Sequence, residues 1–176
     1  FYGTSITQGG CATRPGLGFV NVLGRQLDVP VVDLGFAGCG WMELEMADCL
    51  ARIDASCYVL DCLWNMSSGD SRRSPQKNFE PFVRRLRELR PGVPIVLAEK
   101  SDVFQRGKSP SDRLIRGKYD KLVADGWRDL VYLDKEAMFD DSQEGTVDGV
   151  HPNDLGMMSM AKAFGEAVRT ALKLKK

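Results

Sequence analysis

The chain has 176 residues, which is enough for one domain with a sizeable hydrophobic core. Its 43% hydrophobic and 27% charged residues are typical of a globular protein. Lys and Arg together number 24, as do Asp and Glu, so the formal net charge is zero and a nucleic-acid partner is not expected. No apolar run reaches the roughly 20 residues of a membrane-spanning helix, so no membrane span is expected either.

The first half of the chain alternates predicted strands and helices. In chain order we expect a strand at Phe1–Tyr2, a helix with Phe19, Leu23 and Leu27 on one face, a strand at Val29–Leu34, a helix from Met42 to Ile53 and a strand at Cys57–Leu63. The strands are mostly continuous apolar runs rather than alternating ones. Such runs are typical of strands buried on both faces of a parallel sheet.

The second half continues the alternation. It predicts a helix with the apolar stripe Phe79, Phe82, Val83, Leu86 and Leu89, a strand at Val93–Ala98, a helix from Leu114 to Val123, a strand at Leu130–Leu133 and a last helix from about Pro152 to Leu172. Pro91-Gly92 ends the first of these helices.

Five strands alternating with five helices predict an α/β fold, a three-layer α/β/α sandwich around a five-stranded parallel sheet. In such sheets ligands bind beyond the carboxyl ends of the strands. The loops at those ends, residues 3–14, 35–41, 64–75, 99–112 and 134–152, should therefore carry the chemistry.

His151 is the single histidine of the chain, and Asp148 lies three residues before it. If this stretch is a loop leading into the last helix, the Asp148 carboxylate can reach the Nδ1 hydrogen of His151 and leave Nε2 free as a general base. A lone histidine can equally be a structural or capping residue. As a base, it predicts an acid-side loss of activity near the unperturbed histidine pKa of roughly 6.5.

Ser5 follows the first predicted strand, at the same rim of the sheet as His151. A serine in Gly3-Thr4-Ser5 is compatible with ordinary turn chemistry. It is also compatible with a nucleophile, which needs a base to take its proton. The shared rim favours the nucleophile.

Two further segments could supply hydrogen-bond donors for an oxyanion. The stretch Asp33–Trp41 holds three glycines in six residues, and glycine lets a backbone N–H approach a ligand closely. Asn65 follows the third predicted strand. Taken singly, a glycine-rich turn is more often only a turn, and an asparagine after a strand is more often a loop or cap residue.

Together these blocks resemble the SGNH (GDSL-type) serine esterase and acylhydrolase family. The stretches that carry the resemblance are YGTSITQGG, DLGFAGCG, Asn65 and DGVHPND, in the family's order along essentially the whole chain. The bacterial subgroup that it most resembles has an N-terminal β-rich domain. We therefore expect residues 1–176 to be the SGNH hydrolase catalytic domain, preceded by a further domain.

The resemblance implies a flavodoxin-like fold and metal-independent ester hydrolysis through an acyl-serine, without a cofactor. It implies that Ser5 is the nucleophile, His151 the base and Asp148 its orienting acid. The oxyanion hole would consist of the Ser5 and Gly38 N–H groups and the Asn65 side chain.

Two departures from the family pattern stand out. Thr4 replaces the aspartate of the usual Gly-Asp-Ser motif, and the Gly-x-Asn-Asp block is reduced to the sequence LWNM. Neither change removes a residue with a direct chemical role. An α/β-hydrolase is disfavoured, because its Gly-x-Ser-x-Gly motif needs a glycine where this chain has Thr7.

The substrate is expected to be a small-molecule or carbohydrate ester with a short acyl group, acetyl above all. Candidate pocket residues are Trp41, Trp64 and Met66, and a polar rim could come from Arg14, Asp70, Arg72 and Arg73. An acyltransferase that uses the same acyl-serine and a non-catalytic binding module are the alternatives. The charged segment from Ser101 to Asp112 could be a lid or a solvated loop. The oligomeric state and the compartment stay open.

The five cysteines are an odd set without zinc-site spacing, so neither a metal site nor a full disulfide framework is expected. Cys49, Cys57 and Cys62 lie among apolar residues and are expected to be buried. Cys11 and Cys39 lie in glycine-rich loops, and their roles stay open.

Overall fold

A computed structural model describes residues 1–67, 69–102, 107–139 and 142–174 of the chain. Its centre is a five-stranded sheet in the order β2-β1-β3-β4-β5, with every neighbouring pair parallel. The strands are β1 (Tyr2–Gly3), β2 (Leu34–Gly35), β3 (Tyr58–Asp61), β4 (Ile95–Ala98) and β5 (Leu130–Leu133). The expected parallel sheet is confirmed.

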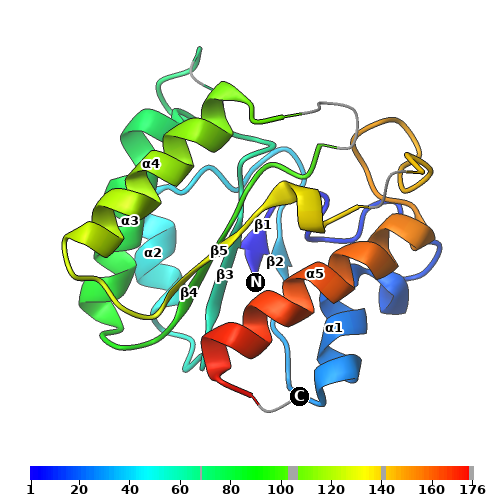
Figure 1. Cartoon of the computed structure of the whole chain (residues 1–176), viewed down its shortest axis with the longest axis horizontal. Coiled ribbons are helices and arrows are strands. Elements are labelled where there is room, and N and C mark those ends of the chain that lie inside the picture. The colour runs from blue at the N-terminus through cyan, green and yellow to red at the C-terminus, as the bar shows by residue number, and fades with distance from the viewer. Residues whose placement is uncertain (68, 103–106, 140–141, 175–176) are drawn as a thin grey trace.

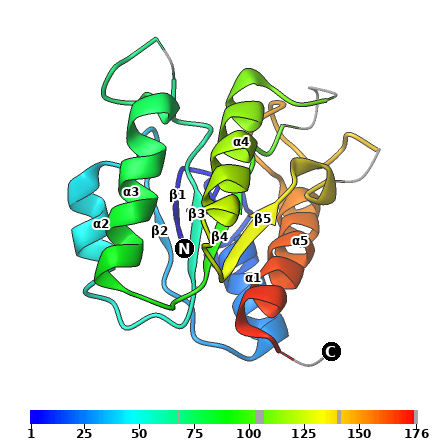
Figure 2. The ribbon, with the colours of Figure 1, turned by 60° about the vertical axis from the view of Figure 1, so that its left-hand side comes forward.

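Helices cover both faces of the sheet, which gives the expected three layers (Figure 1). They are α1 (Phe19–Leu27), α2 (Leu44–Leu50), α3 (Pro75–Leu89), α4 (Pro110–Ala124) and α5 (Asp154–Leu172), with short 3₁₀ turns at Pro15–Leu17 and Lys135–Ala137. Figure 2 shows α1 and α5 on one face and α2, α3 and α4 on the other. Among the described residues, no helix is both long and apolar enough to cross a membrane.

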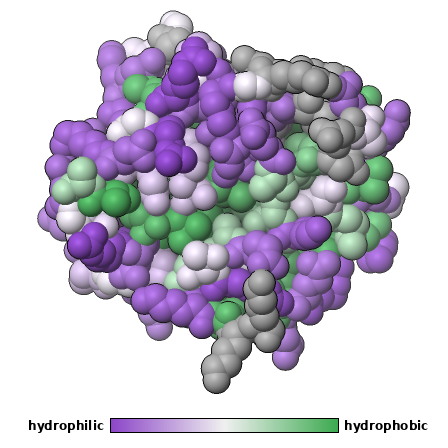
Figure 3. All heavy atoms as spheres, viewed as in Figure 1, coloured by the Kyte–Doolittle hydropathy of each residue, from purple (hydrophilic) through white to green (hydrophobic). Residues whose placement is uncertain are grey.

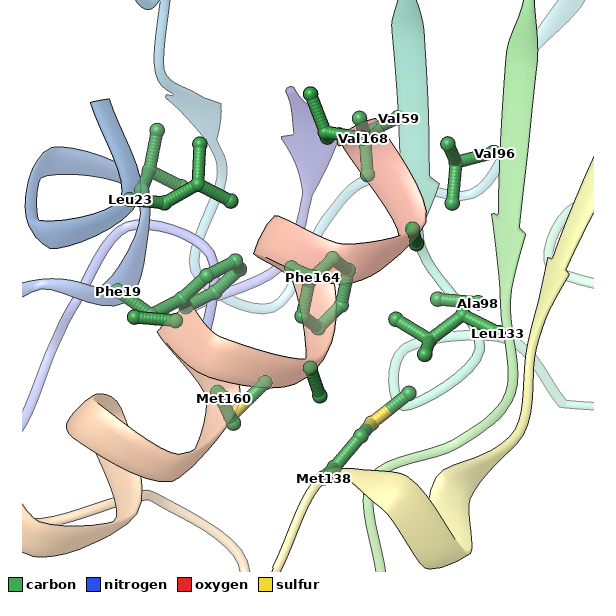
Figure 4. Close-up of a cluster of buried hydrophobic side chains, with 14 of the residues drawn as sticks. Phe19, Leu23, Val59, Val96, Ala98, Leu133, Met138, Met160, Phe164 and Val168 are labelled. Atoms are coloured by element: carbon green, nitrogen blue, oxygen red, sulfur yellow. The ribbon is translucent and has the colours of Figure 1, made fainter. Parts of the chain in front are cut away.

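A separate hydrophobic cluster fills the space on each side of the sheet. The cluster under α1 and α5 contains Phe19 and Phe164, whose ring centroids lie 4.6 Å apart (Figure 4). The cluster on the other face contains Phe79 and Phe82 of α3. Because each face of the sheet is covered by one of these clusters, the central strands β3 and β4 are entirely buried. This burial explains why their sequences are continuous apolar runs.

The edge strand β5 is less covered. Three of its four residues are half-buried. A band of hydrophobic residues crosses the middle of the face in Figure 3, where this edge of the sheet lies.

Several element boundaries differ from the sequence prediction. The strands β3 and β4 are shorter than expected, α2 ends at Leu50 rather than Ile53, and three further differences have a clear physical cause. β2 pairs only at Leu34–Gly35, because its one neighbour, β1, is itself paired over two residues. α2 begins at Leu44 rather than Met42, because Met42 has φ +56°, outside the helical region. α4 begins earlier than expected, because Ser109 and Asp112 form a capping box that starts the helix before its apolar stripe.

The expected burial of the cysteines is only partly right. Cys62 is buried and Cys57 is half-buried, and burial raises the pKa of the Cys57 thiol to about 12. The prediction for Cys49 is wrong, because this thiol is exposed. The inward face of the short helix α2 is taken by Ala47 and Leu50 instead.

Candidate active site

Ser5 lies in the turn that follows β1. The Thr4 N–H donates to Thr7 Oγ1 at 3.2 Å, and the Ile6 N–H donates to Thr4 Oγ1 at 3.2 Å. Only glycine fits at position 3, because a Cβ there would lie 2.0 Å from Thr7 Oγ1. Both threonines are fully buried and Ser5 is half-buried, so the turn is fixed from inside the protein while its serine reaches the surface. Thr4, at the place of the family's aspartate, therefore has a structural role.

His151 connects Ser5 to Asp148 through both of its ring nitrogens. Ser5 Oγ lies 3.0 Å from His151 Nε2, and Asp148 Oδ2 lies 2.7 Å from His151 Nδ1. Residues 146 positions apart in the sequence thus form one continuous chain of hydrogen bonds. The sequence placed the three side chains at one rim, and the structure brings them into contact.

Asp148 also organises the loop that carries the histidine. Its Oδ1 accepts the backbone N–H of His151 at 2.7 Å and that of Val150 at 2.9 Å. These donors, with the His151 backbone N–H first and its side chain next, lower the pKa of Asp148 to about 2. The carboxylate is therefore ionised across the pH range in which most enzymes work.

The last helix continues directly from this loop. Asn153 caps α5 by accepting the Gly156 N–H at 3.1 Å, and its amide donates to the Glu144 carbonyl at 2.7 Å. Asp154, the first residue of α5, accepts both the backbone N–H and the hydroxyl of Thr13, at 2.9 and 2.7 Å. The loop after Ser5 is therefore attached to the helix after His151.

The glycine-rich turn after β2 packs against the start of the Ser5 turn. The Phe36 N–H donates to the Gly3 carbonyl at 3.0 Å, and a Cβ on Gly40 would lie 2.4 Å from that oxygen. Gly38, at the exposed tip, has φ +72°. The backbone N–H groups of Ser5 and Gly38 donate to no other described residue. Both are therefore available to a ligand.

Asn65, the residue predicted as a third donor, lies beside the same turn. Its amide nitrogen donates to the Phe36 carbonyl at 3.4 Å and makes a short contact with the Cys39 carbonyl. Both amide hydrogens are thus directed at backbone oxygens of the turn. To donate to a substrate, Asn65 would have to exchange one of these bonds for the substrate oxygen.

The three candidate pocket residues have different surroundings. Trp41 is half-buried and donates its indole N–H to the Gly38 carbonyl at 3.0 Å. Trp64 donates its indole N–H to the Ser101 carbonyl at 2.7 Å, and the Lys100 ammonium lies 3.9 Å from its ring centroid. Met66 is 7% exposed and packs in the cluster under α2, α3 and α4, so most of its side chain belongs to the core.

The expected polar rim is partly assembled around Trp41. The Arg72 and Arg73 guanidinium groups lie 6.0 and 5.6 Å from the Trp41 ring centroid, and both form ion pairs with Asp70. Arg14, from a different loop, is exposed and belongs to no such cluster among the described residues.

The segment from Ser101 to Asp112 falls partly outside the described residues, at 103–106. Residues 107–112, the part of this segment that leads into α4, are held at the rim by Lys108. The Lys108 ammonium contacts Glu99 Oε2 at 2.5 Å and also pairs with Asp134. Glu99, directly after β4, is 1% exposed and accepts the Tyr132 hydroxyl at 2.6 Å. Sequence reasoning missed this group, although a glutamate directly after an apolar strand was a visible signal.

A second missed residue is Asp61, the last residue of β3. Its carboxylate is buried and accepts the Thr7 hydroxyl at 2.9 Å. Burial raises the pKa of Asp61 to about 6, and the Thr7 bond opposes this rise. The signal was an aspartate inside the apolar run YVLDCL.

Within the described residues, no group of three His, Cys, Asp or Glu side chains could hold a metal ion.

Comparison with protein families gives a match to the GDSL-like lipase/acylhydrolase family over residues 1–169. Among solved structures, one described as a GDSL-like lipase from Bacteroides ovatus ATCC 8483 is 32% identical with a TM-score of 0.86, over 99% of this chain and 53% of that chain. No curated protein matches the chain significantly.

Two more distant structures share the fold. A salicylyl-acyltransferase from a tetracycline biosynthetic pathway is 22% identical with a TM-score of 0.76, over 98% of this chain and 54% of that one. A two-domain esterase active on acetylated mannans, co-crystallised with mannopentaose, is 17% identical with a TM-score of 0.71, over 99% of this chain and 50% of that one. The chain thus spans about half the length of these three proteins.

Proposed function

Because this chain belongs to the GDSL-like lipase/acylhydrolase family, we propose that it is a serine esterase that hydrolyses short-chain acyl esters, acetyl esters above all. The observation that carries the proposal is the hydrogen-bonded series Ser5–His151–Asp148, with contacts of 3.0 and 2.7 Å. This is the arrangement that converts a weakly nucleophilic hydroxyl into an acyl acceptor.

In the first half of the reaction, His151 Nε2 takes the proton of Ser5 Oγ as the oxygen attacks the ester carbonyl. The new C–O bond gives a tetrahedral intermediate with a negative oxygen. His151 then gives its proton to the leaving alcohol as the ester C–O bond breaks, which leaves acyl-Ser5. Asp148 accepts the Nδ1 hydrogen throughout, which keeps the tautomer correct and stabilises the imidazolium.

In the second half, His151 takes a proton from water as the water attacks the acyl-serine. Collapse of the second tetrahedral intermediate breaks the bond to Ser5 Oγ, and the proton on His151 returns to that oxygen. The products are the free acid and the resting serine. No metal ion is required by any of these steps.

The negative oxygen would be stabilised by the Ser5 and Gly38 N–H groups. Removing a single donor of this kind costs roughly 10²–10³-fold in rate, which makes their availability significant. Asn65 would join them after giving up one of its two carbonyl partners.

We infer a hydrophilic alcohol, such as a sugar, on the other side of the ester. Two features support this choice. Trp41, which is bonded to the Gly38 carbonyl, and Trp64, the neighbour of Asn65 in the sequence, are bulky and suit a small acyl group. The Asp70, Arg72 and Arg73 cluster offers polar groups beside Trp41. The fold is shared with an esterase active on acetylated mannans.

An acyltransferase would use the same acyl-serine, with an alcohol in place of water. A salicylyl-acyltransferase has the same fold, so this second function is tested beside the first. Product analysis in the presence of a candidate acceptor alcohol separates the two, because transfer gives a new ester and hydrolysis gives only the free acid.

The proposed function is tested with a series of p-nitrophenyl esters and with acetylated oligosaccharides, on the wild type and on Ser5→Ala. We expect acetate release that depends on Ser5, persists in a metal chelator and exceeds release of long-chain acids. Faster release of octanoate than of acetate would contradict the short-chain assignment. Activity that survives in Ser5→Ala would contradict the serine mechanism.

A further inference from the structure

Asp61 is a buried carboxylate at the end of β3. It is 2% exposed, and among the described residues no Lys or Arg contributes to its charge balance. Its bonding partner is Thr7, whose hydroxyl donates to Asp61 Oδ2 at 2.9 Å. A buried charge without a counter-ion is costly, and a neutral residue would fill the end of β3 at lower cost.

The position of Asp61 connects it to the nucleophile turn. In the parallel ladder between β1 and β3, Asp61 is paired with Gly3. Gly3 lies two residues before Ser5. Thr7 Oγ1, which donates to Asp61, also accepts the Thr4 N–H at 3.2 Å. A short relay therefore runs from the Asp61 carboxylate through the Thr7 hydroxyl to the backbone directly before Ser5.

We propose that Asp61 and Thr7 are a positioning pair for the nucleophile: the Asp61 carboxylate orients the Thr7 hydroxyl, which holds the Thr4 N–H and thereby sets the direction of Ser5 Oγ. The proposal rests on the proposed function, because it gives a role to the Ser5 turn in that reaction. Neither residue touches the reacting atoms.

The direction of this relay is set by the single hydrogen of the Thr7 hydroxyl group. A threonine hydroxyl donates one hydrogen bond and can rotate freely to choose its acceptor. An ionised carboxylate can only accept, so Asp61 takes that hydrogen and leaves the oxygen lone pairs for the Thr4 N–H. Thr7 is fully buried, so water does not compete for its hydroxyl.

The surrounding backbone leaves the turn little room to adjust. A Cβ at Gly3 would lie 2.0 Å from Thr7 Oγ1 and 2.6 Å from the Asp61 carbonyl oxygen, so these groups are packed as closely as glycine permits. A displacement of about 1 Å at a reacting atom can cost on the order of 10²-fold in rate. A change at Asp61 or Thr7 should therefore affect the reactivity of Ser5 rather than substrate binding.

The test uses Thr7→Val, which keeps the shape and removes the hydroxyl, Thr7→Ser, which keeps the hydroxyl, and Asp61→Asn. Thr170→Val is the matched control, because Thr170 is an exposed threonine near the end of α5. The readouts are the rate of Ser5 phosphonylation by a small fluorophosphonate, kcat and KM with p-nitrophenyl acetate, and thermal unfolding.

We expect Thr7→Val to lower the phosphonylation rate and kcat by about 10- to 100-fold with KM within about twofold. Asp61→Asn should give a loss in the same direction, since a neutral amide holds the hydroxyl less strictly. Thr7→Ser should recover most of the rate, and Thr170→Val should match the wild type. The recovery by serine distinguishes positioning from simple loss of packing.

Wild-type phosphonylation rates in folded Thr7→Val and Asp61→Asn would overturn the proposal. If Asp61→Asn does not fold, the comparison of Thr7→Val with Thr7→Ser decides alone. A wild type that is labelled while Ser5→Ala is not leaves the proposed function standing whatever the Thr7 variants do. A wild type that is not labelled at Ser5 overturns both.

Discussion

Asp148 supports His151 in two ways, one through each carboxylate oxygen. Oδ2 accepts the ring Nδ1–H, and Oδ1 accepts the backbone N–H of the same residue. The carboxylate therefore fixes both the tautomer of the ring and the backbone from which the ring extends. An amide at this position could imitate only part of that pattern.

We expect Asp148→Asn to lower kcat by about 10²–10⁴-fold, because the amide permits the wrong tautomer and no longer stabilises the imidazolium. The measurement is kcat with p-nitrophenyl acetate. Asp120→Asn, which changes an exposed aspartate paired with Arg116 on α4, is the matched control. Activity in Asp148→Asn equal to that of the control would contradict the role of Asp148.

The pKa of Asp61 predicts an unusual pH dependence of stability. Because burial raises this pKa from 3.8 to about 6, the folded state binds a proton more tightly than the unfolded state. The cost of ionising Asp61 is therefore absent below about pH 3.8, grows as the pH rises to about 6 and is fully present above that value.

We expect Asp61→Asn to be more stable relative to the wild type at pH 7.5 than at pH 4.5. A pKa shift of about two units corresponds to about 3 kcal/mol in full, and about 2 kcal/mol of it should appear between pH 4.5 and pH 7.5 as a change in the difference between their free energies of unfolding, because part of the cost is already present at pH 4.5. Urea denaturation of both proteins at the two pH values measures it. A difference that does not change with pH would show that Asp61 has an ordinary pKa.

At the scale of elements, close backbone contact holds the loops of the site together. Gly40 has φ +79°, and a side chain there would meet the carbonyl of Gly3. The turn after β2 is thus pressed against the end of β1. The position of Gly38 relative to Ser5 depends on this contact.

We expect Gly40→Ala to lower the free energy of unfolding by about 1–3 kcal/mol, because it combines a strained φ with a backbone collision. It should also reduce the rate of Ser5 phosphonylation. Gly117→Ala is the matched control: Gly117 is exposed within α4 and has nothing near its Cβ position, so alanine should stabilise the helix by about 1 kcal/mol. Equal stability of the two variants in urea denaturation would contradict the account of the turn.

At the rim of the sheet, Lys108 lies just before α4 and neutralises the buried Glu99, which directly follows β4. This ion pair connects the start of α4 to the end of β4. We expect Lys108→Met to lower the free energy of unfolding by roughly 3 kcal/mol, since it leaves Glu99 buried without its cation. Thermal or urea denaturation measures the loss. Lys121→Met, which breaks an exposed pair with Asp125, should change stability by less than about 1 kcal/mol. A Lys108 variant as stable as the Lys121 variant would contradict the assigned role.

At the scale of the whole molecule, the order of the elements could be predicted because apolar runs and helical periodicities alternate clearly. Parallel strands then bring Ser5 and His151 to one rim, although 146 positions separate them. Exact pairing could not be predicted: the length of β2 depends on its neighbour β1, and the exposure of Cys49 depends on how a short helix is rotated. Asp61 was missed because an aspartate in an apolar run shows its bonding partner only after the chain has folded.

The most direct test of the account is the intact mass of the protein after reaction with a small fluorophosphonate, for the wild type, Ser5→Ala and His151→Ala. We expect one covalent adduct on the wild type, none on Ser5→Ala and a strongly slowed reaction of His151→Ala. Labelling of Ser5→Ala, or a folded wild type that stays unlabelled, would contradict the claim that Ser5 is a nucleophile activated by His151.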